Sequence, residues 1–159
     1  MKKLLPYMAG GILGFILALI LVVALMPSMM IRIQPSPMGL EETVETLRAR
    51  AEAQGWVVSG VSAIDESVKK HGGGTVPRVR LVNFCQPQYA ADILNDPEAR
   101  HVSVFMPCTI SVYEGDDGKA YVSSMNAGLL GKMMGGTIAR VMGGSVDADQ
   151  KEVLAFLSE

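Results

Sequence analysis

Two cysteines are the side chains of this sequence with the widest chemical range. Cys85 ends a strand-like alternating segment and directly precedes Gln86-Pro87, where a helix is predicted to start. Cys108 follows Met106-Pro107, between two further strand-like segments. Side chains at such element boundaries are often exposed at one edge of a sheet. The pair is therefore a candidate ligand or thiol site.

Three interpretations of the two cysteines remain open from the sequence. Both can be small buried hydrophobic residues, which is a common role of free cysteine. They can also form a disulfide, which would stabilise the domain by about 3 kcal/mol through loop closure. In the third interpretation they are free thiols that carry out redox chemistry or bind a soft metal.

A soft-metal site would need further sulfur ligands. Met106 lies two residues before Cys108, so on a strand the two share a face, and Met106 is the metal candidate. A thiolate combined with a thioether selects Cu(I). Since methionine mainly fills cores, most of the remaining methionines are expected to be buried there, and no cofactor is assigned. These remaining candidates are Met125, Met133, Met134 and Met142.

The two histidines, His71 and His101, occur in a glycine loop and a polar turn, where solvated side chains are expected. No Ser-His-Asp order, H-E-x-x-H motif or paired-carboxylate motif can be placed on the sequence. The sequence therefore gives no support to an enzyme, and no catalytic residue is assigned.

Glycine is concentrated between residues 128 and 144, in a segment that otherwise reads as a helix. Small residues recur every fourth position, and two cations accompany them. Because glycine costs up to about 1 kcal/mol in a helix, close packing on a neighbour or a partner face should compensate. In the second case the face would contact a partner or a membrane surface. Its residues are Gly131, Lys132, Gly135, Ala139, Arg140 and Gly143.

The chain has 159 residues, of which 49% are hydrophobic and 19% charged, and its formal net charge is −2. This length suits one domain with one extra element. Without a basic excess, no nucleic-acid partner is expected. Two cysteines exclude a disulfide-framework miniprotein and a four-cysteine zinc site.

The hydrophobic excess is concentrated at the N-terminus, where no charged side chain occurs between Leu4 and Met30. A helix of that length reaches about 40 Å, more than the roughly 30 Å of a hydrocarbon core. The run is too long for the apolar region of a signal peptide, and Val23–Pro27 is a poor cleavage site. An uncleaved transmembrane helix in contact with lipid through residues 4–30 is therefore predicted, with a cleaved signal peptide as the alternative.

The flanking charges predict the orientation of this anchor. Lys2, Lys3 and the free amine precede it, while only Arg32 follows it closely. The positive-inside rule then predicts a single pass through a prokaryotic cytoplasmic membrane, with the N-terminus inside and the remainder on the extracytoplasmic face. Gly10 and Gly14 form a G-x-x-x-G pair that could bring two anchors together in a homodimer.

Residues 1–35 are interpreted as the anchor and a short linker, and residues 36–159 as one globular domain. The fold class predicted is α+β, with a largely antiparallel sheet and helices on one face, preceded by the transmembrane helix. Gly115–Gly118 is a hairpin turn signal, and Asp147 with Gln150 resembles a capping box. Helices are predicted over 37–54, 86–96, 127–142 and 148–157, with a short helix or turn over 65–70, and strands over 56–64, 77–85, 101–106, 109–114 and 120–124.

Three segments are informative together: Asn83–Ala90, Met106–Glu114 and Gly118–Tyr121. They resemble the domain of unknown function 302 family, which has a similar cysteine before a proline-started helix and a later proline-cysteine before a strand. The resemblance covers about residues 40–157. It implies a compact α+β domain with the two cysteines near each other, and it implies no established activity. The glycine-rich segment at 128–144 is similar to that of membrane-anchored members.

The sequence thus favours a membrane-anchored, non-enzymatic binding or accessory module with its site at the edge formed by Cys85 and Cys108. The alternative is a thiol-redox or soft-metal protein of the Cu(I) type that uses the same two cysteines. A homodimer through the anchor or through the helix at 128–144 is a further expectation.

Overall fold

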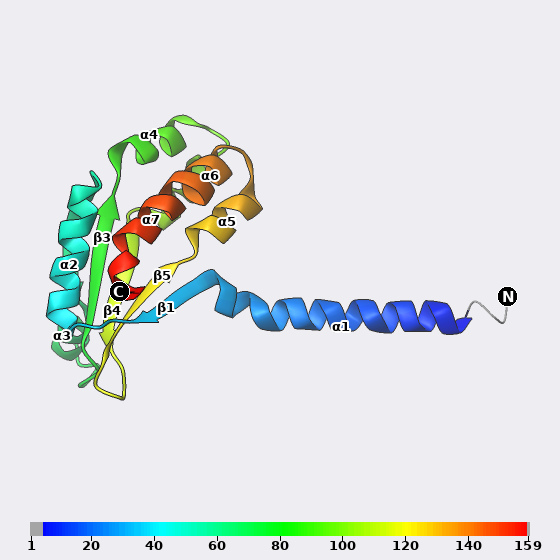
Figure 1. The fold of residues 1–159 in the computed structure, drawn as a ribbon, viewed down its shortest axis with the longest axis horizontal. Coiled ribbons are helices and arrows are strands. Elements are labelled where there is room, and N and C mark those ends of the chain that lie inside the picture. The colour runs from blue at the N-terminus through cyan, green and yellow to red at the C-terminus, as the bar shows by residue number, and fades with distance from the viewer. Residues whose placement is uncertain (1–4, 159) are drawn as a thin grey trace.

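The computed structural model describes residues 5–158, in which a long N-terminal helix projects from an α+β body (Figure 1). Lys2, Lys3 and Leu4, which bear on the predicted anchor and its orientation, lie outside the described residues. So do the side chains of residues 5–13, and with them the surroundings of Gly10.

The N-terminal helix α1 spans Leu5–Met30, and its large apolar side chains from Phe15 onward are exposed. Gly14 has no atom within 4 Å of the position of a Cβ. Within the part of the chain that the structure describes, no helix has the length and apolar character needed to cross a membrane.

The body is built on one antiparallel sheet of five strands in the order β1-β5-β4-β3-β2, which confirms the α+β prediction. The hairpin predicted at Gly115–Gly118 connects β4 and β5. The strands are β1 (Ile31–Pro35), β2 (Val57–Ala63), β3 (Val79–Cys85), β4 (Cys108–Glu114) and β5 (Ala120–Met125). The helices that follow α1 are α2 (Leu40–Ala53), α3 (Ile64–Lys70), α4 (Pro87–Asn95), η1 (Arg100–Phe105), α5 (Ala127–Met134), α6 (Gly136–Arg140), η2 (Val141–Val146), α7 (Asp147–Val153) and η3 (Ala155–Ser158).

Strand alternation separates a covered face of the sheet from a second face. Val82, Val112 and Val122 are almost fully buried on the covered face, against α2 and the C-terminal helices. The helix α2 contributes a stripe that includes Leu47, at 0% exposure. The other face carries half-buried side chains, among them the stacked pair Tyr113 and Tyr121 with ring centroids 5.7 Å apart.

The structure adds a strand that the sequence did not predict. Residues 31–35, expected to end the anchor and form a linker, are β1, which pairs with β5 along the edge of the sheet. Proline is tolerated on an edge strand, so Pro35 does not prevent the pairing.

The strand predicted at residues 101–106 is wrong, because Arg100–Phe105 form the 3₁₀ helix η1. Its β-branched and aromatic residues suggested a strand, on which Val102 and Val104 would share a face, but Val102 is 1% exposed and Val104 is 78% exposed. The ladder between β3 and β4 ends at the Phe84–Cys108 pair, so this segment has no strand to pair with.

The single helix predicted at 127–142 is also wrong. Gly135 and Gly136 adopt φ values of 73° and 53°, which end α5, and the chain turns into α6 and then the π-helical η2. Asp147 does not cap the last helix, since no side-chain cap bond is present at its start. Instead, its buried carboxylate accepts a hydrogen bond from Arg32 at 3.0 Å and pairs with Lys151 at 2.7 Å.

Candidate functional site

The two cysteines lie on neighbouring strands at one end of the sheet. Cys108 is paired with Phe84, so Cys85 stands one residue beyond it at the end of β3. Both are free and partly buried. Since neighbouring strand positions project to opposite faces, this register does not favour a disulfide between them.

Both cysteines line a cavity of about 40 Å³ between the sheet end, α4, η1 and η2. Its wall is almost entirely apolar. Four sulfur-bearing residues line it: Cys85, Met106, Cys108 and Met142. The aromatic residues Trp56, Phe84, Tyr89 and Phe105 enclose much of the rest.

A second cavity of about 30 Å³ adjoins the first and shares Trp56, Phe84 and Cys108 with it. The side-chain oxygen of Gln150 is buried beside this space, with no hydrogen-bond partner among the described residues. The thiol of Cys108 thus lies at the junction of two small apolar spaces.

Asp149 of α7 fixes the aromatic wall of the main cavity. The indole N–H of Trp56 donates to its Oδ2 at 3.0 Å, and the hydroxyl of Tyr89 donates to the same oxygen at 3.1 Å. The two rings meet edge to face, with centroids 5.9 Å apart. Burial, followed by the neighbouring Asp149, raises the pKa of Tyr89, so this hydroxyl stays protonated as a donor.

The apolar surroundings control the protonation of Cys108. Burial, and secondarily the nearby Cys85, raises the pKa of the Cys108 thiol from its ordinary value of 9.0 to about 11. At neutral pH the thiol is therefore protonated, and it is a poor nucleophile because the thiolate is the reactive form.

The other predicted ligands do not reach this cavity. Met133 and Met134 are 58% and 42% exposed on α5, contrary to the core positions expected for them. His71 and His101 are exposed, as predicted. Within the described residues, no three His, Cys, Asp or Glu side chains are grouped to hold a metal.

Comparison with known proteins gives the family. The sequence matches the family described as "Domain of unknown function DUF302" over residues 33–156. The chain belongs to the DUF302 family. It is also similar in structure to an uncharacterized conserved DUF302 protein from Bacillus stearothermophilus, with a TM-score of 0.67 and 22% sequence identity, over 81% of this chain and 96% of that one. No curated protein matches.

In this DUF302 domain the glycine-rich segment is a site of close packing. A Cβ on Gly131 would collide with the backbone of Gly143, and a Cβ on Gly143 would lie 3.0 Å from the Lys132 nitrogen. The predicted partner face is therefore divided: Gly131 and Gly143 are buried against each other across the α5–η2 hairpin. Lys132 and Arg140 are exposed, with Arg140 paired to Asp92 at 3.0 Å, while Gly135 and Ala139 are half-buried.

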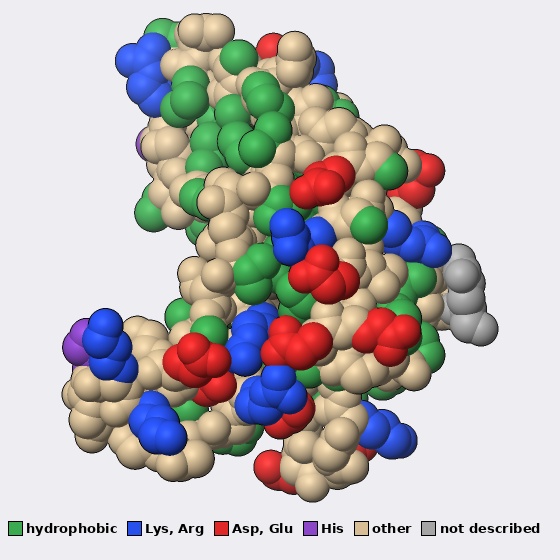
Figure 2. All heavy atoms as spheres, turned by 90° about the vertical axis from the view of Figure 1, so that its left-hand side faces the viewer, with side chains coloured by type: hydrophobic (Ala, Val, Ile, Leu, Met, Phe, Trp, Pro, Cys, Tyr) green, Lys and Arg blue, Asp and Glu red, His purple; other side chains and the backbone are tan. Residues whose placement is uncertain are grey.

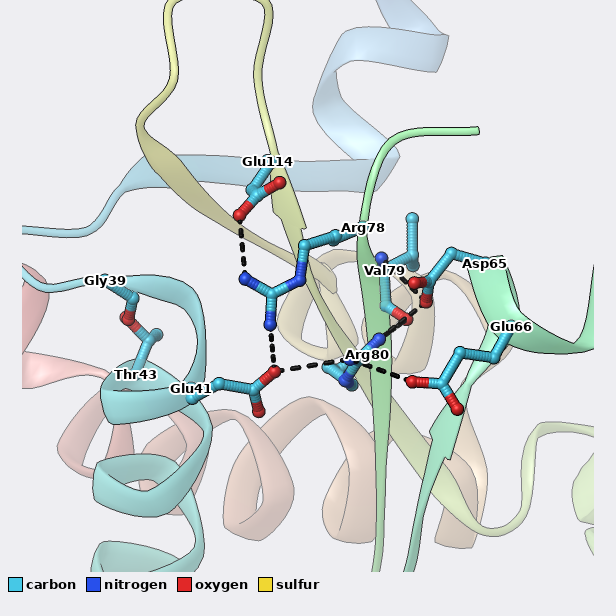
Figure 3. A network of polar contacts seen from close by, with 9 residues as sticks. All are labelled: Gly39, Glu41, Thr43, Asp65, Glu66, Arg78, Val79, Arg80 and Glu114. Atoms are coloured by element: carbon cyan, nitrogen blue, oxygen red, sulfur yellow. Dashed lines mark hydrogen bonds and ion pairs between the residues drawn. The ribbon is translucent and has the colours of Figure 1, made fainter. Parts of the chain in front are cut away.

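A group of ion pairs surrounds Arg78 and Arg80 at the other end of β3 (Figure 3). The side chain of Arg80 is only 12% exposed and contacts carboxylates from both α2 and α3. The members are Arg78, Arg80, Glu41, Asp65, Glu66 and Glu114. Because carboxylates already pair with both guanidinium groups, the cluster links β3 to its neighbours and leaves no free cation for a ligand.

The surface of the DUF302 domain has a charged region and a hydrophobic region. Figure 2 shows acidic and basic side chains interleaved over the lower part of one face, and hydrophobic side chains gathered at the end where α4 lies. Exposed hydrophobic residues of α4 and η1 include Leu94, Val104 and Phe105, of which Phe105 also lines the cavity.

The sequence identified both cysteines and Met106 but missed the aromatic wall. Trp56 and Asp149 are separated by 93 positions in the chain, and Tyr89 and Asp149 by 60. The one signal for Trp56 was its being the single tryptophan, placed at the start of a predicted strand.

Proposed function

We propose that this protein is a membrane-anchored, non-enzymatic binding or accessory module whose ligand site is the cavity at the Cys85/Cys108 edge. The observation that carries the proposal is that both cysteines line one apolar cavity, whose wall includes Trp56 and Tyr89, each hydrogen-bonded to Asp149. Apolar walls with a few oriented polar groups are typical of ligand sites.

The protonated state of the Cys108 thiol supports ligand binding in preference to covalent catalysis. The pKa of Cys108 is raised to about 11, so its sulfur holds its proton at neutral pH. Thiol-redox chemistry through a Cys85–Cys108 disulfide would in addition require backbone movement, given the pairing register of β3 and β4.

The membrane anchor in this proposal rests on the sequence of residues 4–30, which contains no charged side chain. The lysines before it and the single Arg32 after it support an N-terminus in the cytoplasm and a domain on the extracytoplasmic face. Pairing of two copies through Gly10 and Gly14, or through exposed residues of the 128–144 segment, belongs to the same proposal.

The location is tested with a reporter enzyme fused after Glu159. We expect a reporter that functions only outside the cytoplasm to be active, and the chain to remain in the membrane fraction after alkaline washing. Activity restricted to a cytoplasmic reporter would overturn the orientation. Release of the chain by the alkaline wash would overturn the anchor.

The site is tested with methyl methanethiosulfonate, which transfers a methylthio group to an accessible thiol. We expect the folded, full-length Cys85→Ser chain in detergent micelles, in which Cys108 is the one remaining thiol, to be modified, and the fluorescence of Trp56, the single tryptophan, to change. The double variant Cys85→Ser/Cys108→Ser is the blank. Modification that occurs only after unfolding would show that no small molecule reaches the cavity, and the proposed site would be wrong.

A further inference from the structure

Three sulfur-bearing residues that pack in or against the core also line one small cavity: Met106, Cys108 and Met142. Cys85, at the end of β3, projects to the face opposite Cys108. Met106 follows η1, Cys108 starts β4 and Met142 lies in η2, so the three come from separate elements. We propose that this cavity binds a single Cu(I) ion through these thiol and thioether sulfurs. The inference rests on the proposed function and specifies the ligand of the same site.

The size of the cavity favours an ion over a metabolite. Pockets for drug-sized ligands typically hold about 300–1,000 Å³. This cavity holds about 40 Å³, and its neighbour about 30 Å³. A space that accommodates one or two water molecules also accommodates a metal ion that is held by the surrounding side chains.

The donor atoms favour Cu(I) over other metals. The described residues that line the cavity include no histidine, aspartate or glutamate. Calcium and magnesium need oxygen ligands, and zinc sites use thiolate, imidazole or carboxylate. Thioether sulfur together with thiolate is the set that selects Cu(I). The apolar wall, which includes Trp56 and Phe84, keeps water from the site.

The apolar wall of the cavity also determines the net charge expected for the copper complex. A net charge is costly in an apolar space, so a neutral complex is expected. Cu(I) brings one positive charge, and the loss of one thiol proton to solvent balances it. The thiolate of Cys108 then binds the ion beside the thioethers of Met106 and Met142. The copper keeps its oxidation state, because no electron is transferred in this step.

The position of Cys108 makes its sulfur the central ligand. Its side chain borders both cavities, next to the strand end that carries Cys85. A bound metal ion lowers the pKa of a coordinating thiol enough to deprotonate it outright.

The test is an anaerobic titration of the full-length chain in detergent micelles with a Cu(I) acetonitrile complex, in competition with a chromogenic Cu(I) chelator. We expect one ion per chain, release of about one proton per ion, and X-ray absorption with sulfur scatterers alone. Cys108→Ser should weaken binding about a hundredfold, and Met142→Leu about tenfold, because each removes one sulfur ligand. Circular dichroism establishes that each variant is folded.

Matched controls come from the exposed methionines of α5. Met133→Leu and Met134→Leu remove the same type of ligand outside the cavity, so both should leave the affinity unchanged. If Cys108→Ser fails to fold, Cys108→Ala is used for the same comparison.

Two results would overturn the Cu(I) assignment: binding no tighter than in the Cys85→Ser/Cys108→Ser variant, or binding that Met142→Leu leaves unaltered. If the methylthio reagent still modifies the folded protein in that case, only the identity of the ligand is wrong. If the reagent also fails, the proposed site is wrong as well.

Discussion

Alkylation of Cys108 measures how strongly the cavity excludes charge. The pKa of this thiol is raised from 9.0 to about 11, with burial as the main cause. Each pKa unit changes the thiolate fraction about tenfold below both values. In Cys85→Ser, where Cys108 is the one remaining thiol, iodoacetamide should therefore react about a hundredfold more slowly at neutral pH than with an ordinary thiol.

The shape of the pH profile separates this effect from steric hindrance. The rate should keep rising about tenfold per pH unit beyond pH 9, because the thiolate is the reacting form. A shielded thiol of ordinary pKa would react slowly at all pH values but would reach its plateau just above pH 9. Mass spectrometry of the alkylated chain against time gives the rate. An inflection near 9.0 would refute the electrostatic argument.

The raised pKa of Cys108 also makes the stability of the fold depend on pH. A thiol whose pKa is higher in the folded state favours folding below the unfolded value, and this contribution is lost as the pH rises toward the folded value. From 9.0 and about 11, the full contribution is about 2.7 kcal/mol at 1.36 kcal/mol per unit. The free energy of unfolding should therefore fall by about 2 kcal/mol relative to Cys108→Val by pH 11.

Three further predictions concern contacts that hold the site in place, each measured by urea unfolding. Gly131→Ala should destabilise the fold by about 1–3 kcal/mol, because its Cβ has no room against the neighbouring backbone. Arg32→Met should cost about 1–3 kcal/mol, since it removes a hydrogen bond to the buried Asp147. Trp56→Phe should cost about 1–2 kcal/mol through the loss of its N–H bond to a carboxylate.

Controls for these variants lie nearby in the structure. Gly144→Ala, whose Cβ would meet its nearest atom only at 4.0 Å, should be neutral or stabilising by up to about 1 kcal/mol. Lys119→Met breaks an exposed pair 3.8 Å long and should change stability by less than about 0.5 kcal/mol. Equal losses in Gly131→Ala and Gly144→Ala would contradict the close-packing argument. A null effect of Arg32→Met would show that Asp147 does not depend on it.

Local sequence patterns were sufficient to predict much of the fold. Alternation predicted a strand over residues 77–85, where the structure has β3 at Val79–Cys85, and turn residues predicted the hairpin that connects β4 and β5. Proline and cysteine spacing placed Cys85 and Cys108 at element boundaries, and the structure places them on adjacent strands at the same end of the sheet. These features depend on neighbours in the chain, so a single sequence contains them.

The remainder depends on contacts between distant segments. Met142 was one of five candidate methionines, and nothing local distinguished it from Met134, which the sequence placed in the core and the structure leaves 42% exposed. The break at Gly135 separates the two, because a glycine can continue a helix or end it in a left-handed conformation. The edge strand β1 could not be predicted from local sequence either, because its pairing partner β5 lies about ninety positions away.

The junction of α1 and β1 leaves no spacer between helix and sheet. The helix ends at Met30, β1 begins at Ile31, and Asn126 donates to the carbonyl oxygens of both Met29 and Met30 at 2.8 Å. A flexible ten-residue linker would let a domain wander by about 18 Å. Here no linker allows the domain to move over such a distance relative to α1. If α1 is fixed in a bilayer as proposed, the cavity is held at a constant distance from the membrane surface and in a constant orientation to it, so the proposed ligand would have to reach it there.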